Sequence, residues 1–319
     1  MKVVVTRKIP RVGIDALEDA GLEVAGNPTE KLLVGEELKS FIKGAEAVLC
    51  LIMDKIDDSV FEAAGPQLKI VANYGMGFDN IDTESAKKRN VLVSNTPSPL
   101  SAQAVAEFTV GLMFSLSKRI VETDKFARQG NFSGWKPELF IGKNLEGKTL
   151  GLIGMGNIGS RVAKMARGLG MRVVYNKRSR DSELEKELGL EFMSLDNLLR
   201  ESDFVSLHCP LTNETCGLIN EERINLMKDS AFLINTARGK IVDESALANA
   251  LKTGRLAGAG LDVFEYEPEI NHELLGLPNV VLTPHIASSV QEVRDEMALM
   301  AAKNIIEALA GRTPPNLVG

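Results

Sequence analysis

The chain has 319 residues, of which 44% are hydrophobic and 25% are charged, and its formal net charge at pH 7 is -6. This length predicts about two domains of ordinary globular composition. The acidic balance argues against a general affinity for nucleic acid or anionic membranes, so small molecules are the expected partners.

Neither a membrane span nor a metal site is predicted. No apolar run reads as long enough to cross a bilayer, and the N-terminal apolar stretch is too short for a signal peptide. The cysteines Cys50, Cys209 and Cys216 are odd in number and lack metal-ligand spacing. A disulfide framework and a zinc site are therefore not expected. A cytoplasmic location is expected.

Alternating strands and helices are predicted in the first part of the chain. Short apolar runs at 3–6, 47–51, 68–73 and 91–94 are separated by amphipathic stretches. This alternation is typical of βα units in a parallel sheet. A segment of helical character at 102–126, interpreted as a hinge helix, and a loop at 130–147 follow.

A glycine-rich turn follows the third of these strands, in the sequence Tyr74-Gly75-Met76-Gly77-Phe78-Asp79. Backbone N–H groups in such a turn can bind an anion, and a substrate carboxylate is the anion expected here. A plain tight turn is the alternative.

The motif Gly154-Met155-Gly156-Asn157-Ile158-Gly159 lies in the middle of the chain. An apolar strand is predicted before it at 149–153, a helix after it at 160–170, and a second strand at 171–175. In a dinucleotide site the first glycine makes the turn, the second admits the pyrophosphate and the third lets the helix pack on the strand. A turn without a ligand is the alternative.

The end of the second strand of this unit favours NADPH over NADH. NAD-selecting units usually carry an acidic residue there, about twenty residues past the glycines. This chain has Asn176-Lys177-Arg178-Ser179-Arg180 instead, and three cations with a hydroxyl suit a 2′-phosphate. A solvated basic surface is the alternative, and NADH stays possible.

The remaining chain predicts a second parallel sheet. Candidate strands lie near 204–207, 231–235, 257–261 and 280–283, and the last helix, 289–310, is too long and too late for that sheet alone. The expected fold is α/β, with two Rossmann-like or flavodoxin-like parallel-sheet domains. A domain at 100–288, which binds the nucleotide, is inserted into a discontinuous one, 1–99 completed by 289–319, which binds the substrate.

The three histidines differ in context. His208, before Cys209 and Pro210 at a strand end, is expected to be structural or at the cofactor's edge, and His272 is expected to be exposed in a polar loop. His285 lies at the carboxyl end of a predicted strand, where open α/β sheets place ligand-contacting groups. It is therefore the best acid/base candidate.

Reduction of a 2-keto acid would give roles to three residues. The reaction needs a hydride donor, a proton donor for the developing alkoxide and a cation for the substrate carboxylate. His285 with Glu267 as its carboxylate partner fits the proton donor, and Arg238 fits the cation. Spacing alone leaves structural or solvated roles open for all three.

Four motifs resemble the D-isomer-specific 2-hydroxyacid dehydrogenase family, and the likeness runs essentially from end to end. In the family's order and spacing they are Leu152-Ile153-Gly154-Met155-Gly156-Asn157-Ile158-Gly159, Asn235-Thr236-Ala237-Arg238-Gly239, Leu261-Asp262-Val263-Phe264 with Glu267-Pro268, and Thr283-Pro284-His285-Ile286-Ala287-Ser288. The resemblance implies that Arg238 binds substrate, that Glu267 supports the histidine and that His285 donates the proton.

The resemblance also implies the other contacts of the site. Asp262 would hold the nicotinamide amide, and the N–H groups of Met76 and Gly77 would bind the substrate carboxylate. Beyond the glycine motif and residues 177–179, the expected cofactor contacts are Pro210, Thr236, Ala237, Arg238, Asp262, His285 and Ala287. A homodimer built largely through the nucleotide-binding domains is implied as well.

Within the family the chain most resembles the glyoxylate/hydroxypyruvate reductases. The basic residues at 177–179 match the NADP(H)-using members, and Trp135 lies in a stretch that resembles a loop reaching the other subunit's active site. An apolar anchor for the interdomain loop is the alternative for Trp135. Ile52 and Met53 stand where phosphoglycerate dehydrogenases carry basic residues, which favours a small uncharged substrate tail.

The resulting hypothesis is NADPH-dependent reduction of glyoxylate, hydroxypyruvate or a similar short 2-keto acid, with domain closure excluding water. One alternative is a D-2-hydroxyacid dehydrogenase for a larger apolar 2-keto acid, which Ile52, Met53 and Trp135 would permit. A less favoured alternative is a non-enzymatic, cofactor-sensing binding protein on the same fold.

Overall fold

The computed structural model describes residues 1–318 and divides into two compact units. Unit 1 comprises Met1–Ser101 and the C-terminal segment from Ser289, and unit 2 comprises Ala102–Ser288. The first boundary between the two units, at 101/102, lies two residues later than the expected boundary at 99/100. The reason is that helix α5 (Pro99–Ser117) begins in unit 1 and continues into unit 2.

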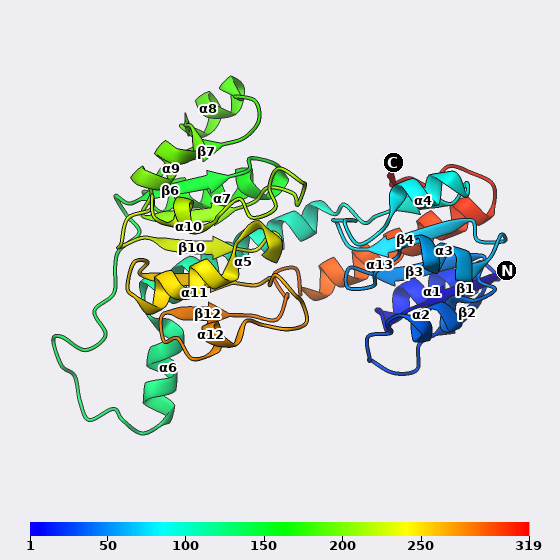
Figure 1. Ribbon diagram of the computed structural model, residues 1–319, viewed down its shortest axis with the longest axis horizontal. Helices are drawn as coiled ribbons and strands as arrows, with labels where there is room; N and C mark the ends of the chain where they lie inside the picture. Colours follow the sequence, from blue (N-terminus) through cyan, green and yellow to red (C-terminus); the bar gives the residue numbers. More distant parts are fainter. Residues whose placement is uncertain (319) are drawn as a thin grey trace. The chain divides into compact units, whose positions relative to one another are not determined.

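Unit 1 is a six-stranded sheet in the order β13-β5-β4-β3-β1-β2. Figure 1 labels β1, β2, β3 and β4 of this sheet. The strands are β1 (Lys2–Val5), β2 (Glu23–Gly26), β3 (Ala47–Leu51), β4 (Ile70–Tyr74), β5 (Leu92–Ser94) and β13 (Leu317–Val318). Only β13 runs antiparallel to its neighbour. Residues of both faces of β3 and β4 are buried, which explains why these strands read as continuous apolar runs.

Helices cover the sheet of unit 1. They are α1 (Arg11–Asp19), α2 (Glu36–Ile42), α3 (Asp58–Ala64), α4 (Thr83–Lys88) and α13 (Gln291–Leu309). The side chains of Asp57 and Asp82 accept hydrogen bonds from first-turn N–H groups and so fix where α3 and α4 begin. The expected return of the last helix is confirmed, because α13 packs on β4 and α1 within unit 1.

Unit 2 contains a seven-stranded parallel sheet in the order β12-β11-β10-β9-β6-β7-β8. Its strands are β6 (Thr149–Ile153), β7 (Arg172–Asn176), β8 (Glu191–Phe192), β9 (Phe204–Leu207), β10 (Phe232–Asn235), β11 (Gly258–Leu261) and β12 (Val280–Leu282). The chain moves outward from β6 in one direction and then from β9 in the other. This order has its topological switch between β6 and β9, where doubly wound sheets bind nucleotides.

Unit 2 also contains helical elements. Besides most of α5 they are α6 (Ile120–Arg128), α7 (Asn157–Gly168), α8 (Ser182–Leu188), α9 (Leu195–Glu201), α10 (Glu221–Ile224), the 3-10 turn η1 (Gly239–Ile241), α11 (Glu244–Lys252) and α12 (His272–Leu275). The helix expected at 102–126 is two helices. Ser117 O accepts a hydrogen bond from the Lys143 N–H at 2.7 Å, and Arg119 has a φ of 56°, so α5 ends before α6 begins.

Helix α5 corrects the expectation about membrane spans. By length and composition alone it qualifies as a candidate span, although 56% of its apolar window is buried inside the protein. One such helix is weak evidence, because a buried core helix meets the same criteria.

Candidate active site

The glycine turn after β6 requires glycine at two positions, Gly154 and Gly159, because of backbone conformation and close packing. Gly154 has a φ of 97°, and a Cβ there would lie 2.5 Å from the backbone N of Cys209. A Cβ on Gly159 would lie 2.4 Å from Gly154 O, so this glycine lets α7 pack against the turn. The expected roles of the first and third glycines therefore correspond to packing that the structure shows.

Gly156 differs, because a Cβ there would meet no protein atom within 4 Å. The chain itself does not require a glycine at this position. No side chain caps the N-terminus of α7, and the N–H groups of Asn157, Ile158 and Gly159 donate to no acceptor in residues 1–318. Open space beside free N–H groups at a helix N-terminus fits the pyrophosphate of a dinucleotide.

The basic segment after β7 is partly engaged with the chain's own carboxylates. Lys177 pairs with Asp181 at 3.1 Å, and Arg180 pairs with Glu185 at 2.7 Å. Arg178 and Ser179 are exposed, and neither forms a hydrogen bond or ion pair within the described chain. Of the three cations counted in the sequence, Arg178 is thus the one best able to meet a 2′-phosphate.

His208 is not an acid/base group near neutral pH. Burial lowers its pKa from 6.5 to about 3, and Nε2 lies 2.9 Å from the Ser206 hydroxyl. Its backbone N–H donates to Ile153 O at 2.7 Å, which places it beside the glycine turn at the switch between β6 and β9. His272 is exposed, as expected, although it begins the short helix α12 rather than lying in a loop.

His285 and Glu267 form a histidine–carboxylate pair in unit 2. His285 Nδ1 lies 2.8 Å from Glu267 Oε2, and the second oxygen of Glu267 accepts the Phe264 N–H at 2.9 Å. The carboxylate is therefore held by backbone and in turn orients the imidazole. Nε2 of His285 has no partner among residues 1–318, so it is the nitrogen left to meet a substrate oxygen.

Asp262 connects the end of β11 to this histidine. Its fully buried carboxylate accepts three hydrogen bonds from the loop around His285, from Thr283 Oγ1 at 2.6 Å, Ile286 N at 2.9 Å and Ala287 N at 2.8 Å. The expected contact with a nicotinamide amide stays a prediction. What the structure shows is a carboxylate already occupied in fixing the loop on which His285 stands.

Arg238 lies in the turn after β10, directly before η1. The Asn235 side chain spans this turn, accepting the Ala237 N–H at 3.0 Å and donating to Arg238 O at 2.9 Å. A Cβ on Gly239 would lie 1.8 Å from the carbonyl carbon of Phe264. The turn carrying Arg238 thus packs directly on the loop that leads to Glu267.

The three candidate residues therefore stand at one edge of one sheet, because they follow the neighbouring parallel strands β10, β11 and β12. Thr236, which precedes Ala237, is buried, and its hydroxyl lies 2.9 Å from that of Thr109 on α5. Pro210 follows β9 at this edge and is exposed, whereas Ala287 is buried.

The candidate substrate residues of unit 1 follow β3 and β4, which are neighbours in the sheet. Ile52 and Met53, after β3, and Met76 and Gly77, after β4, are all half-buried. A Cβ on Gly75 would lie 2.2 Å from Ile52 Cγ2, so the Ile52 side chain lies against the backbone of the second loop.

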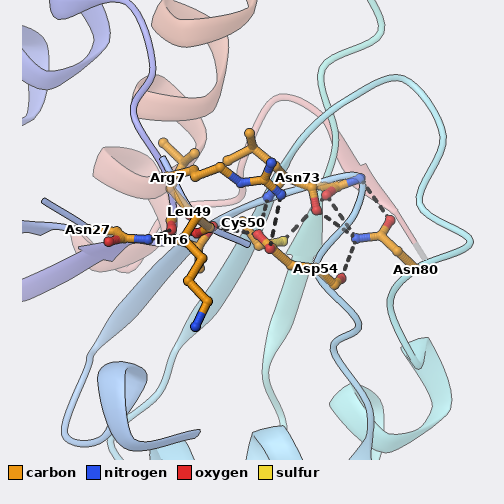
Figure 2. Close-up of polar contacts among 10 residues, drawn as sticks. Thr6, Arg7, Asn27, Leu49, Cys50, Asp54, Asn73 and Asn80 are labelled. Atoms are coloured by element: carbon orange, nitrogen blue, oxygen red, sulfur yellow. Dashed lines mark hydrogen bonds and ion pairs between the residues drawn. The ribbon is translucent and has the colours of Figure 1, made fainter. Parts of the chain in front are cut away.

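A buried polar network that the sequence did not reveal holds these loops, and Figure 2 shows its centre. Asp54, which is 1% exposed, accepts hydrogen bonds from the Thr6 hydroxyl and the Leu51 N–H. Asn80 donates to Leu51 O at 3.2 Å, to Asp54 O at 3.0 Å and to Asn73 Oδ1 at 3.2 Å. The one available signal was a polar residue, Asn73, inside the apolar run of β4.

Trp135 lies between α6 and β6 and is 83% exposed. Phe132 and Ile141 in the same stretch are also exposed. This exposure argues against the alternative of an apolar anchor packed on the chain. No group of three or more His, Cys, Asp or Glu side chains within residues 1–318 is arranged to hold a metal ion.

Comparison with known proteins agrees with this geometry. The family model described as "D-isomer specific 2-hydroxyacid dehydrogenase, NAD binding domain" matches residues 110–287. The glyoxylate reductases of Thermococcus kodakarensis and Pyrococcus horikoshii are 49% and 50% identical to the chain, covering 99% of it and 96% and 95% of their own lengths. The crystal structure of the TT0316 protein from Thermus thermophilus superposes with a TM-score of 0.93 at 44% identity, covering both chains completely.

Two similar solved structures contain cofactors, and the cofactors differ. An NADPH-dependent glyoxylate/hydroxypyruvate reductase from Sinorhizobium meliloti, in complex with NADP and malonate, has a TM-score of 0.86 at 29% identity over 100% of this chain and 96% of that one. A D-lactate dehydrogenase from Aquifex aeolicus, complexed with NAD and lactic acid, has a TM-score of 0.87 at 33% identity, covering 100% of this chain and 99% of that one.

Proposed function

The chain belongs to the D-isomer-specific 2-hydroxyacid dehydrogenase family, and on this premise we propose that it reduces glyoxylate or hydroxypyruvate with NADPH. It is an oxidoreductase with a nicotinamide-nucleotide-binding domain and a small acid as substrate. The choice of keto acid and the preference for NADPH are the parts that we propose.

The observation that carries the proposal is the His285–Glu267 pair at 2.8 Å, in which Nε2 of the imidazole has no partner among residues 1–318. When bound, the nicotinamide supplies the hydride that reduces the keto carbon. His285 donates a proton from Nε2 to the oxygen that becomes the alcohol. Glu267, held by the Phe264 N–H, keeps the ring oriented and balances the charge of the imidazolium.

Arg238 is assigned to the substrate's carboxylate and carbonyl oxygens, because a guanidinium offers several donors in a fixed plane. The rigid turn built by Asn235 and Gly239 supports this role. The N–H groups of Met76 and Gly77 are assigned to the carboxylate as well. Ile52, which lies against Gly75, is apolar and suits an uncharged substrate tail.

The preference for NADPH is supported by the end of β7. Asn176 is the last residue of the strand, and its side chain donates to Met193 O at 2.7 Å instead of presenting an acid to a ribose hydroxyl. Exposed Arg178 and Ser179 follow directly and suit a 2′-phosphate.

Steady-state kinetics on glyoxylate, hydroxypyruvate, pyruvate and a branched 2-keto acid, each with NADPH and NADH, test this function. We expect the highest kcat/KM for one of the two short acids with NADPH. Selection of the branched acid would favour the dehydrogenase for larger substrates, and cofactor binding without turnover of any acid would favour the binding protein. A higher kcat/KM with NADH would contradict the cofactor assignment.

We further propose a homodimer in which the exposed segment around Trp135 contacts the second copy. Phe132, Trp135 and Ile141 are at least 66% exposed, and exposed apolar groups of this kind are typical of interfaces. Analytical ultracentrifugation tests the proposal, since a monomer at micromolar concentration would contradict it.

A further inference from the structure

The turn that follows β4 has three consecutive carbonyl oxygens held by donors of unit 1. The bonds run from the Thr96 N–H to Gly75 O at 3.0 Å, from Asn95 Nδ2 to Met76 O at 2.7 Å, and from Asn73 Nδ2 to Gly77 O at 2.6 Å. Two of the three donors are side-chain amides of buried asparagines.

Fixing a carbonyl oxygen also fixes the next N–H, because both belong to one planar peptide and point in opposite directions across it. Asn95 therefore sets the direction of the Gly77 N–H through Met76 O. By the same geometry Asn73 sets the direction of the Phe78 N–H through Gly77 O, and the Thr96 N–H sets the direction of the Met76 N–H through Gly75 O. These three N–H groups donate to no acceptor within residues 1–318.

The two asparagines are themselves held firmly. Asn73 is fully buried, forms a reciprocal amide pair with Asn80 at 3.2 Å in both directions, and accepts from the Cys50 thiol at 3.4 Å (Figure 2). Asn95 is 8% exposed, and its backbone oxygen accepts from Asn304 Nδ2 at 3.1 Å. A buried amide that turned away from its acceptors would lose these bonds without gaining water.

We propose that Asn95 and Asn73 are positioning residues of the substrate site, which turn the N–H groups of Gly77 and Phe78 toward the carboxylate of the substrate. The inference rests on the proposed function, which assigns the Met76 and Gly77 N–H groups to that carboxylate. The Phe78 N–H is added here as a third donor. The side chains of Asn95 and Asn73 orient the Gly77 and Phe78 N–H groups, whereas the Met76 N–H is oriented by the Thr96 backbone. A row of successive N–H groups held in this way is an anion receptor.

The kinetic test uses Asn95→Ala and Asn73→Ala with Asn27→Ala as the matched control. Asn27 is a buried asparagine of the same unit whose amide donates to Thr6 O at 3.0 Å and Lys31 O at 3.2 Å, and it bonds none of the carbonyl oxygens of residues 75–77. We expect the KM for glyoxylate to rise about tenfold in each of the first two variants, with kcat and cofactor Kd unchanged. The control should keep the KM of the natural chain, and a KM that is equally unchanged in Asn95→Ala and Asn73→Ala overturns the proposal.

A binding test separates this inference from the proposed function, because it needs no turnover. Oxalate, a dicarboxylate without a reducible carbonyl, is titrated into the cofactor-bound protein by calorimetry, and the amide signals of residues 76–78 are followed by NMR. Oxalate should shift the Gly77 and Phe78 amide signals, and its Kd should rise about tenfold in Asn95→Ala.

Each outcome of the binding test decides one question. If oxalate shifts these amide signals but the protein reduces no keto acid, the proposed function is contradicted and the anion receptor is supported. Failure of oxalate to shift these signals in the natural chain would overturn the receptor, even if Asn95→Ala or Asn73→Ala did not fold.

Discussion

His285 has a φ of 54°, in the left-handed region that residues other than glycine rarely adopt. Its own N–H donates to Thr283 O at 3.0 Å, and the next two N–H groups donate to the carboxylate of Asp262. The buried carboxylate thus offsets the cost of an unfavourable backbone conformation. The position of the imidazole depends on β11 as well as on its partner Glu267.

Replacing Asp262 by Asn should impair both catalysis and folding. The amide NH2 group has to face at least one of the donors Thr283 Oγ1, Ile286 N and Ala287 N, and the loop must shift. We expect kcat to fall by roughly 100-fold, as for a catalytic group misplaced by about 1 Å. The free energy of unfolding should fall by about 1–3 kcal/mol.

Steady-state kinetics and urea titration measure the two effects of Asp262→Asn. Asp243→Asn is the control, since Asp243 caps α11 through one bond from the Ala246 N–H and an Asn oxygen can still accept it. Unchanged stability in Asp262→Asn would show that the carboxylate does not support the loop.

Alanine at two glycines of the same turn should separate ligand contact from packing. Gly156→Ala places a Cβ in open space, so the free energy of unfolding should change by less than about 0.5 kcal/mol while the Kd for NADPH rises at least tenfold. Gly159→Ala places a Cβ 2.4 Å from Gly154 O and should destabilise the protein by about 1–3 kcal/mol. Cofactor titration and urea unfolding measure both, and normal NADPH affinity in Gly156→Ala would contradict the phosphate assignment.

The sequence allowed prediction of residues that belong to a motif and missed residues that do not. The glycine turn was predicted from its spacing after a strand, and Arg238, Glu267 and His285 were predicted from their places after strands and from the family's motifs. Asn73 and Asn95 carry no such pattern, since each is one polar residue whose role depends on a carbonyl in another loop. Apart from the polar Asn73 inside the apolar run of β4, buried hydrogen bonds between distant segments leave no local pattern in the chain.

Strands and helices were predictable to the extent that their apolar residues alternate with turn residues. The strands β3 and β6 have the predicted bounds, whereas β2, β8 and β13 were missed. The missed strands have at most four residues, and each contains at least one exposed position, so they lack an apolar run. The break between α5 and α6 was also missed, because it depends on the hydrogen bond from Lys143 to Ser117.

The end of β9 should make folding stability depend on pH. His208 has a folded-state pKa of about 3 against an ordinary value of 6.5, with burial as the cause. The unfolded chain therefore takes up this proton below pH 6.5, while the folded chain stays neutral until about pH 3. Stability from this group is complete above pH 6.5 and is lost as the pH falls, by up to about 1.4 kcal/mol per pH unit.

The variant His208→Asn tests this dependence by urea unfolding between pH 7 and pH 4. The variant should lose less stability than the natural chain over this range, and His272→Asn should behave like the natural chain because His272 is exposed. Identical slopes for His208→Asn and the natural chain would show that His208 is protonated in the folded state.

The whole chain combines one continuous unit with one discontinuous unit. The return of the last helix to unit 1 was predictable from its length and its place after the final strand of unit 2. The internal contacts of that helix were not. Tyr74 donates its hydroxyl hydrogen to Arg294 O at 2.7 Å, and a Cβ on Gly13 would lie 2.8 Å from Ala298 Cβ.

These contacts predict that the two units differ in their ability to fold alone. Residues 99–288 include both core clusters of unit 2, so this fragment should unfold cooperatively and bind NADPH. Residues 1–101 lack α13, whose buried Val293, Met297 and Ile305 each contribute about 1.5–3 kcal/mol. Circular dichroism with urea should show no cooperative transition for 1–101 until 289–319 is joined to it by a linker, and a cooperative transition without that segment would contradict the role assigned to α13.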